Sequence, residues 1–188
     1  MLKDEIAKAL KVIQEGGIIL YPTDTIWGIG CDAANTEAVQ KIYKLKQRSE
    51  SKSMIILLDT DAKLPSYIKE VPDLAYNLIE YAENPLTLVM PGARNISPAL
   101  IAADGSVGIR VAKHPFCEGL IQRLRKPLVS TSANISGKPS PQYFSQVEQE
   151  IIEGVDYVVD IDQHSMEIKT PSTIMRLEAD GKFEFIRR

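Results

Sequence analysis

Two short stretches of this chain hold side chains that suit a ligand carrying phosphate groups. Lys46 and Arg48 end a basic segment, and residues 130–137 read Ser-Thr-Ser-Ala-Asn-Ile-Ser-Gly. Arginine offers phosphate oxygens a planar fork and lysine offers a mobile point charge. If the chain is extended beyond a helix end here, the alternation of side chains aims both cations at one point. The alternative is a solvated helix end, where cations are favoured by the helix dipole.

The serine-rich stretch directly follows the apolar pair Leu128–Val129, which we expect to be a buried strand. Ligands of open α/β sheets collect beyond the carboxyl ends of strands, and Ser130 and Ser132 point the same way if the strand continues. An ordinary polar loop remains the alternative, because Ser, Asn and Gly dominate loops. The sequence contains neither a G-x-S-x-G elbow nor a P-loop, which argues against a serine hydrolase and a P-loop enzyme.

Two further features are candidates for a binding site. Residues 21–28 read Tyr-Pro-Thr-Asp-Thr-Ile-Trp-Gly and place Thr23 where an apolar strand ends. This segment is either the lip of a pocket for a ligand the size of an amino acid or a turn that satisfies its own backbone. Arg110 lies in an apolar strand, where a charge is costly unless it is paired or lines a cleft. For Arg110 we leave the functional and the structural interpretation open.

The hydrophobic pattern predicts an α/β protein with an open, mixed and largely buried sheet flanked by helices. The predicted helices are 4–14, a helix capped by Asn35 or Thr36, 73–82, 116–125, and 144–153 with Gly154 as its cap. The predicted strands are 18–21, 54–58, 86–90, 107–112, 128–129, 157–161, 172–177 and 183–187.

Composition limits the class of protein. The 188 residues, 44% hydrophobic and 25% charged, predict one globular domain over residues 1–188. The net charge of -3 excludes a polycation, so a nucleotide or RNA site has to come from local clustering, as in residues 41–52 with five basic residues and one acidic residue. Two cysteines without a CxxC pair predict no metal site and a reducing compartment. We expect a cytoplasmic protein, because no apolar run approaches the roughly 20 residues of a membrane span and no signal peptide is evident.

Taken in order, these stretches resemble the YrdC family, the threonylcarbamoyl-AMP synthases, from Gly16 to Arg187. The similarity rests on Tyr-Pro-Thr-Asp-Thr, on Lys-Pro-Leu-Val-Ser-Thr-Ser-Ala-Asn, on Ile-Ser-Gly-Lys-Pro-Ser-Pro, and on a tetrad formed by Lys46, Arg48, Ser132 and Asn134. The resemblance implies an open twisted sheet with a basic concave face. It also implies a nucleotidyltransferase that joins L-threonine, bicarbonate and ATP, with Mg²⁺ carried by the phosphates, into threonylcarbamoyl-adenylate and pyrophosphate. Further proteins then transfer the threonylcarbamoyl group to tRNA.

The resemblance also assigns roles to individual residues, with no protein ligand for a metal. It implies catalytic roles for Lys46 and Arg48. For ATP it implies Arg48, Lys52, Ser106, Ser132, Asn134, Ser140 and Arg187. For threonine it implies Thr23, Arg110, Ser130 and Ser172. The implied partners are the three substrates, tRNA or double-stranded RNA, and the downstream transfer proteins, without a membrane.

Two alternatives remain open. The first is an RNA-binding protein without catalysis, which a basic concave face would equally serve. The second is a diverged paralogue of the YciO type with another substrate. Ser49 after Arg48 and Asn84 before Pro85 depart from the common family pattern. The small side chains expected to converge in a pocket favour an enzyme over an RNA binder, and the Ser-Ala-Asn triplet favours the synthase.

Overall fold

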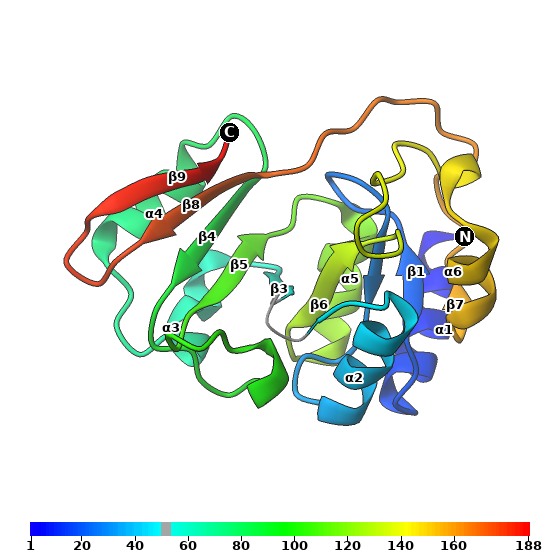
Figure 1. Ribbon diagram of the computed structural model, residues 1–188, viewed down its shortest axis with the longest axis horizontal. Helices are drawn as coiled ribbons and strands as arrows, with labels where there is room; N and C mark the ends of the chain where they lie inside the picture. The colour runs from blue at the N-terminus through cyan, green and yellow to red at the C-terminus, as the bar shows by residue number, and fades with distance from the viewer. Residues whose placement is uncertain (50–53) are drawn as a thin grey trace.

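A nine-stranded mixed sheet forms the centre of the computed structural model, which describes residues 1–49 and 54–188 (Figure 1). Its spatial order is β7 (Tyr157–Val158), β1 (Ile19–Tyr21), β2 (Gly28–Gly30), β6 (Leu128–Ser132), β3 (Ile55–Leu58), β5 (Val107–Val111), β4 (Leu86–Met90), β8 (Thr173–Leu177) and β9 (Phe183–Arg187). The pairs β1–β7, β3–β5 and β4–β8 are parallel, and the remaining pairs are antiparallel. The prediction of an open mixed sheet is confirmed.

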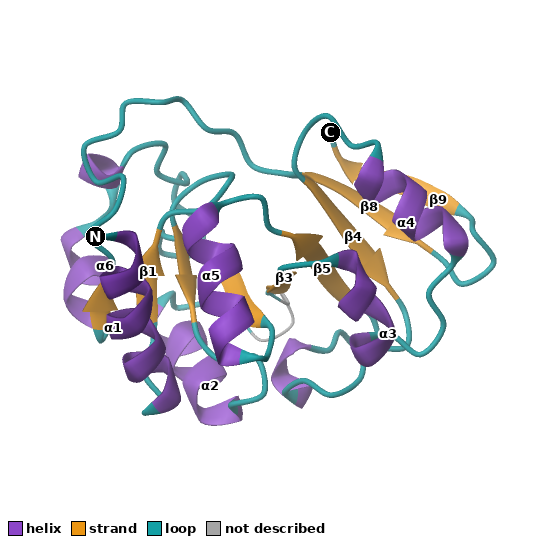
Figure 2. Ribbon diagram, turned by 180° about the vertical axis from the view of Figure 1, so that it is seen from behind, coloured by secondary structure: helices purple, strands orange, loops and turns teal. Residues whose placement is uncertain are grey.

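Helices cover the sheet and enclose two hydrophobic cores. They are α1 (Leu2–Gln14), α2 (Thr36–Leu45), α3 (Leu64–Tyr67), α4 (Asp73–Glu80), α5 (Pro115–Leu124) and α6 (Gln149–Gly154). Because side chains alternate along β3, Leu57 joins the core beneath α1 and α5, whereas Ile56 and Leu58 join the core of α2 and α4. Figure 2 shows α1 and α5 side by side against the strands. None of the described helices is long and apolar enough to cross a membrane.

The start of α2 follows its sequence signal. The side chain of Asn35 accepts a hydrogen bond from the amide of Ala38 at 3.1 Å, which satisfies one of the free donors of the first turn. The predicted cap is therefore confirmed. This helix matters for the site because its other end carries Lys46 and Arg48.

The predicted single helix over 144–153 is wrong. The structure has a 3₁₀ turn at Phe144–Gln146, an extended residue at Val147, and then α6. The side chain of Val147 is buried in the core, which requires the chain to leave the helical path there. Gly154 is the last residue of α6 rather than its cap, and a Cβ at this position would lie 2.2 Å from Cδ1 of Leu45.

The strand β2 was not predicted, and β6 is longer than predicted. Glycines disfavour strands, so Gly28–Gly30 carried no strand signal. Glycine is nevertheless required, because a Cβ at Gly30 would lie 2.3 Å from the carbonyl oxygen of Val129. The insertion of β2 beside β6 keeps the chain extended as far as Ser132.

A long connection, residues 159–172, crosses from β7 to β8 (Figure 1, orange). Lys169 Nζ donates to the carbonyl oxygen of Thr23 at 2.9 Å, and His114 Nε2 lies 3.1 Å from a carboxylate oxygen of Asp162. These contacts fasten the connection to the segment after β1 and to the start of α5. The strand predicted over 157–161 is consequently confined to Tyr157–Val158.

Candidate active site

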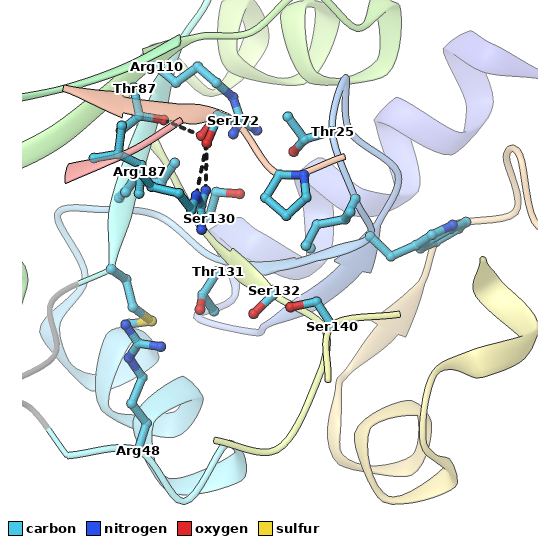
Figure 3. A pocket seen from close by; sticks show the side chains of 17 residues that line it. Thr25, Arg48, Thr87, Arg110, Ser130, Thr131, Ser132, Ser140, Ser172 and Arg187 are labelled. Carbon is cyan, nitrogen blue, oxygen red and sulfur yellow. Dashed lines mark hydrogen bonds between the residues drawn. The ribbon is translucent and has the colours of Figure 1, made fainter. Parts of the chain in front are cut away.

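One cavity of about 220 Å³ brings together side chains from both halves of the sequence (Figure 3). Three arginines reach it from three different elements: Arg48, Arg110 and Arg187. Seven hydroxyl-bearing residues complete its polar lining: Thr25, Thr87, Ser130, Thr131, Ser132, Ser140 and Ser172. Guanidinium groups surrounded by hydroxyl groups suit a ligand with several anionic oxygens.

Arg110 lines the cavity and lies beside a buried carboxylate. Its side chain is only 4% exposed, and its Nη2 lies 3.2 Å from Oδ1 of Asp24, whose side chain is 8% exposed. Nevertheless, Nε and Nη2 of Arg110 and Oδ1 of Asp24 have no hydrogen-bond partner within the described part of the chain. Nη2 and Oδ1 are therefore ion-paired without a well-formed hydrogen bond, whereas Nε has neither kind of partner. Because buried donors are nearly always satisfied, Nε is the donor that a ligand carboxylate would complete.

Arg187 clamps the beginning of β8. Its Nε and Nη2 donate to the carbonyl oxygen of Ser172 at 3.1 and 2.7 Å, and the hydroxyl groups of Ser172 and Thr87 lie 2.8 Å apart (Figure 3). The register between β8 and β9 shifts here, since Ile174 pairs with Arg187 but Met175 pairs with Phe185. Such a bulge re-aims a side chain, and Arg187 thereby reaches the cavity. Burial and the charge of Arg110 lower the pKa of Arg187, which indicates a strongly positive environment.

The path of the chain from α2 to Arg48 differs from the extended segment predicted. Gln47 has a φ of 49°, its amide donates to the carbonyl of Lys44, and the amide of Arg48 donates to that of Tyr43. These bonds form a Schellman motif with Gln47 in the left-handed position. Lys46 and Arg48 therefore do not point to the same place. Arg48 lines the cavity, and burial lowers its pKa.

The end of β6 supplies hydroxyl groups to the cavity. Ser130 and Ser132 both line it, as predicted for a continued strand, and Ser140 joins them from the loop that follows. Gly28 pairs with Ser132 across β2 and β6, and a Cβ on Gly28 would lie 3.4 Å from Oγ of Ser130. The glycine keeps this part of the cavity free of side chains.

Some predicted residues lie outside the cavity lining. The hydroxyl of Thr23 bonds within its own turn, to the hydroxyl of Thr25 at 2.9 Å and to the carbonyl of Ile26 at 2.8 Å. Ser106 donates to Asp104 at 2.6 Å in the loop before β5. Lys52 lies outside the described residues.

Lys46 and Asn134 also lie behind the cavity rather than in it. The ammonium of Lys46, 1% exposed, contacts the loop after β6, including the side chain of Asn134. Asn134 Nδ2 in turn donates to the carbonyl of Lys138 at 2.6 Å. Both side chains are therefore engaged by the protein itself.

Sequence reasoning missed Thr25 and Thr87. Thr25 belongs to the segment singled out at residues 21–28, but the structure brings it, and not Thr23, to the cavity. Thr87 is fully buried between Leu86 and Leu88, so a lone hydroxyl in an apolar strand was the available signal. The same signal had drawn attention to Arg110.

The described lining carries no carboxylate, imidazole, thiol or amine. Across residues 1–49 and 54–188, no three His, Cys, Asp or Glu side chains are grouped so that they could hold a metal ion. The described side chains of the cavity can therefore bind and orient charged reactants, and they offer arginine and hydroxyl donors for negative charge.

Comparison with known proteins gives consistent matches. The family model of Sua5, YciO and YrdC, described as "Telomere recombination", matches residues 11–188. The threonylcarbamoyl-AMP synthase of Pseudoalteromonas translucida is 35% identical over 158 residues, which cover 82% of this chain and 84% of that protein. The structure of P. abyssi Sua5 complexed with L-threonine is similar with a TM-score of 0.81 and 29% identity, covering 92% of this chain. This chain spans half the length of that protein.

A third match concerns the fold alone. The crystal structure of E. coli YciO superposes with a TM-score of 0.85 at 21% identity, over 100% of this chain and 90% of that one.

The family model covers most of the residues, and the relative at 35% identity extends over more than two thirds of both chains. This chain therefore belongs to the Sua5/YciO/YrdC family.

Proposed function

We propose that this protein is an L-threonylcarbamoyl-AMP synthase, and that the described cavity holds threonine and ATP together. The observation that carries the proposal is the buried Arg110, which lines the same cavity as Arg48 and whose Nε has no partner in the described structure. A carboxylate and a phosphate chain are thereby given separate cations at one site. The relatives named as threonylcarbamoyl-AMP synthases support the assignment.

Arg110 would bind the carboxylate of threonine, with hydroxyl groups of Ser130 and Ser172 near the rest of the amino acid. Thr23 would act by shaping the turn that presents Thr25. The phosphates of ATP would lie toward Arg48, Ser132 and Ser140, and Arg187, which is bonded to Ser172, would reach them from the threonine side. Lys52 and Ser106 remain proposed ATP contacts on the family resemblance alone, and Mg²⁺ would enter on the phosphates.

The proposed chemistry has two steps. The neutral amine of threonine attacks the carbon of bicarbonate, a C–N bond forms, and water leaves to give a carbamate. A carbamate oxygen then attacks the α-phosphorus of ATP, and the bond to the bridging oxygen breaks, so that pyrophosphate leaves with its electron pair. Such phosphoryl chemistry depends mainly on positioning and on neutralising charge. The cavity offers both through its arginines and hydroxyl groups.

Pyrophosphate release tests this proposal. We expect release from ATP only when threonine and bicarbonate are both present, and none when either is omitted. Equal release without threonine would show a different reaction at this site. The absence of release from folded protein with all three substrates would contradict the synthase assignment.

We further propose that the product serves tRNA modification in the cytoplasm through separate transfer proteins. If a basic face also contacts tRNA, its affinity should fall steeply as salt rises, because counterion release drives such binding. The Ser132→Ala variant, altered only inside the cavity, should keep that affinity. An affinity for tRNA that does not depend on salt would exclude an electrostatic contact of this kind.

A further inference from the structure

The ammonium group of Lys46 is enclosed by the loop that follows β6. It donates to the carbonyl oxygen of Ser132 in a short contact, to that of Asn134 at 2.6 Å, and to the side-chain oxygen of Asn134 at 3.4 Å. An ammonium group has three N–H donors, so these three oxygens occupy all of them. Lys46 is 1% exposed and is not part of the cavity lining.

The backbone of Lys46 holds the same loop. The amide of Ser136 donates to the carbonyl oxygen of Lys46 at 2.8 Å. The turn is closed from the other side by Asn134, whose Nδ2 donates to the carbonyl oxygens of Ile135 and Lys138. The residues on either side of this loop, Ser132 and Ser140, are the ones whose side chains line the cavity. The loop around Lys46 therefore sets the position of two candidate ATP contacts.

The burial of the Lys46 ammonium group is costly, and the oxygens around it offset this cost. None of the ion pairs among the described residues involves Lys46. Burial together with the charge of Arg48 lowers the pKa of Lys46 to about 7. The carbonyl oxygens of Ser132 and Asn134 both carry partial negative charge and converge on one point. Without a donor between them they would repel each other and be left buried and unsatisfied.

We infer that Lys46 is a positioning residue that holds the backbone of Ser132–Asn134 in its binding conformation, and that it makes no contact with the phosphates. This inference rests on the proposed ATP site, and it replaces the catalytic role expected from the sequence. The Schellman motif at Gln47 explains how Lys46 and Arg48, which are two residues apart, point in different directions and serve two purposes. Lys46 stabilises the loop, and Arg48 faces the ligand.

The test compares Lys46→Met with Arg48→Met, because both remove one cation from the same stretch. The first measurement is amide hydrogen exchange in the ligand-free protein. In Lys46→Met we expect the amides of Ala133, Asn134 and Ser136 to exchange about tenfold faster or more, because the loop opens locally. In Arg48→Met we expect these amides to exchange at the wild-type rate.

The second measurement is the affinity for AMP and for ATP. If Lys46 acts through the loop, Lys46→Met loses the same factor, about tenfold, for both nucleotides. Arg48→Met should lose more for ATP than for AMP, since it removes a direct partner of the phosphate chain. If Lys46→Met does not fold, Lys46→Gln, which keeps two N–H donors, takes its place.

Two results would overturn the inference. One is unchanged exchange of the three loop amides in the Lys46 variant. The other is a loss of affinity that grows from AMP to ATP, as in the arginine variant, which would make Lys46 a phosphate ligand. If the wild-type protein binds neither nucleotide, the proposed function fails, while the exchange measurement still decides the role of Lys46 in the loop.

Discussion

We propose that substrate recognition depends most on Arg110. A buried arginine beside a buried aspartate is expensive unless both are fully satisfied, yet two donors of Arg110 and one oxygen of Asp24 lack hydrogen bonds in the described structure. A bound carboxylate would accept from Arg110, whereas the oxygen of Asp24 needs a donor from the ligand. The free energy cost of the unsatisfied Arg110–Asp24 pair in the free protein is thus reduced when the ligand binds.

We predict that Arg110→Lys weakens threonine binding by about tenfold or more, because a point charge cannot replace a two-donor edge. Arg110→Met should in addition destabilise the fold by about 3–5 kcal/mol, since Asp24 then remains charged and buried alone. Calorimetric titration with threonine and denaturant unfolding measure the two effects.

The double variant Asp24→Asn/Arg110→Met separates stability from binding. It should regain most of the lost stability, because no unpaired charge is left, and it should still fail to bind threonine. Recovery of threonine binding in the double variant would show that Arg110 serves the fold only.

At the scale of elements, the end of α2 decides where Arg48 points. The Schellman motif places Gln47 at a φ of 49°, a conformation that costs an L-residue about 1–2 kcal/mol. A glycine avoids this cost. It also lowers the stability by about 0.4–1 kcal/mol, because it increases the conformational entropy of the unfolded chain.

We therefore predict that Gln47→Gly stabilises the protein slightly, by about 0.5 kcal/mol, and leaves ATP affinity unchanged. Gln47→Val, whose branched side chain resists this conformation, should lower both the free energy of unfolding and the ATP affinity. Thermal melts and ATP titration of the pair check this. A stabilising Gln47→Val would be incompatible with the motif.

The approach of β2 to β6 depends on a missing side chain. A Cβ on Gly30 would lie 2.3 Å from the carbonyl of Val129, which is backbone in the middle of the sheet and cannot turn aside. At Gly119, within α5, a Cβ would meet Cδ1 of Ile6 at 2.6 Å, the flexible end of a side chain. A side chain at Gly30 would therefore have to displace backbone, whereas one at Gly119 would have to displace only the end of a side chain.

We predict that Gly30→Ala costs about 3 kcal/mol or more, above the usual range for overpacking. Gly119→Ala should cost much less, because Ile6 can rotate and alanine favours the helix by about 1 kcal/mol. Denaturant unfolding of both variants gives the comparison. If both variants lost the same free energy of unfolding, the close approach of β2 to β6 would not depend on Gly30.

At the scale of the whole molecule, regular patterns made most of the architecture predictable. Alternation and strand length located β4, β5 and β9 almost residue for residue, and the cap of α2 is Asn35, one of the two candidates predicted. The glycine strand β2 was not predictable, because its reason is the close approach of a distant strand. The break at Val147 likewise follows from tertiary burial, which overrides helical periodicity.

Part of the cavity lining was predictable from the sequence, but its geometry was not. The cavity contains Arg48, Arg110, Ser130 and Ser132, yet no sequence pattern shows that Lys46 turns away from its neighbour. That difference arises from a left-handed residue at a helix end. Similarly, Arg187 reaches the cavity through a bulge between β8 and β9, which sequence spacing does not reveal.

We propose that one cavity of this protein joins threonine, bicarbonate and ATP. The most direct measurement is mass spectrometry of the product formed from ¹³C-bicarbonate, threonine and ATP. We expect a single compound that contains threonine, the labelled carbon and AMP, and we expect it to be lost in Arg110→Lys at low threonine concentration. Formation of AMP and pyrophosphate without the labelled carbon in any adenylate would contradict the account.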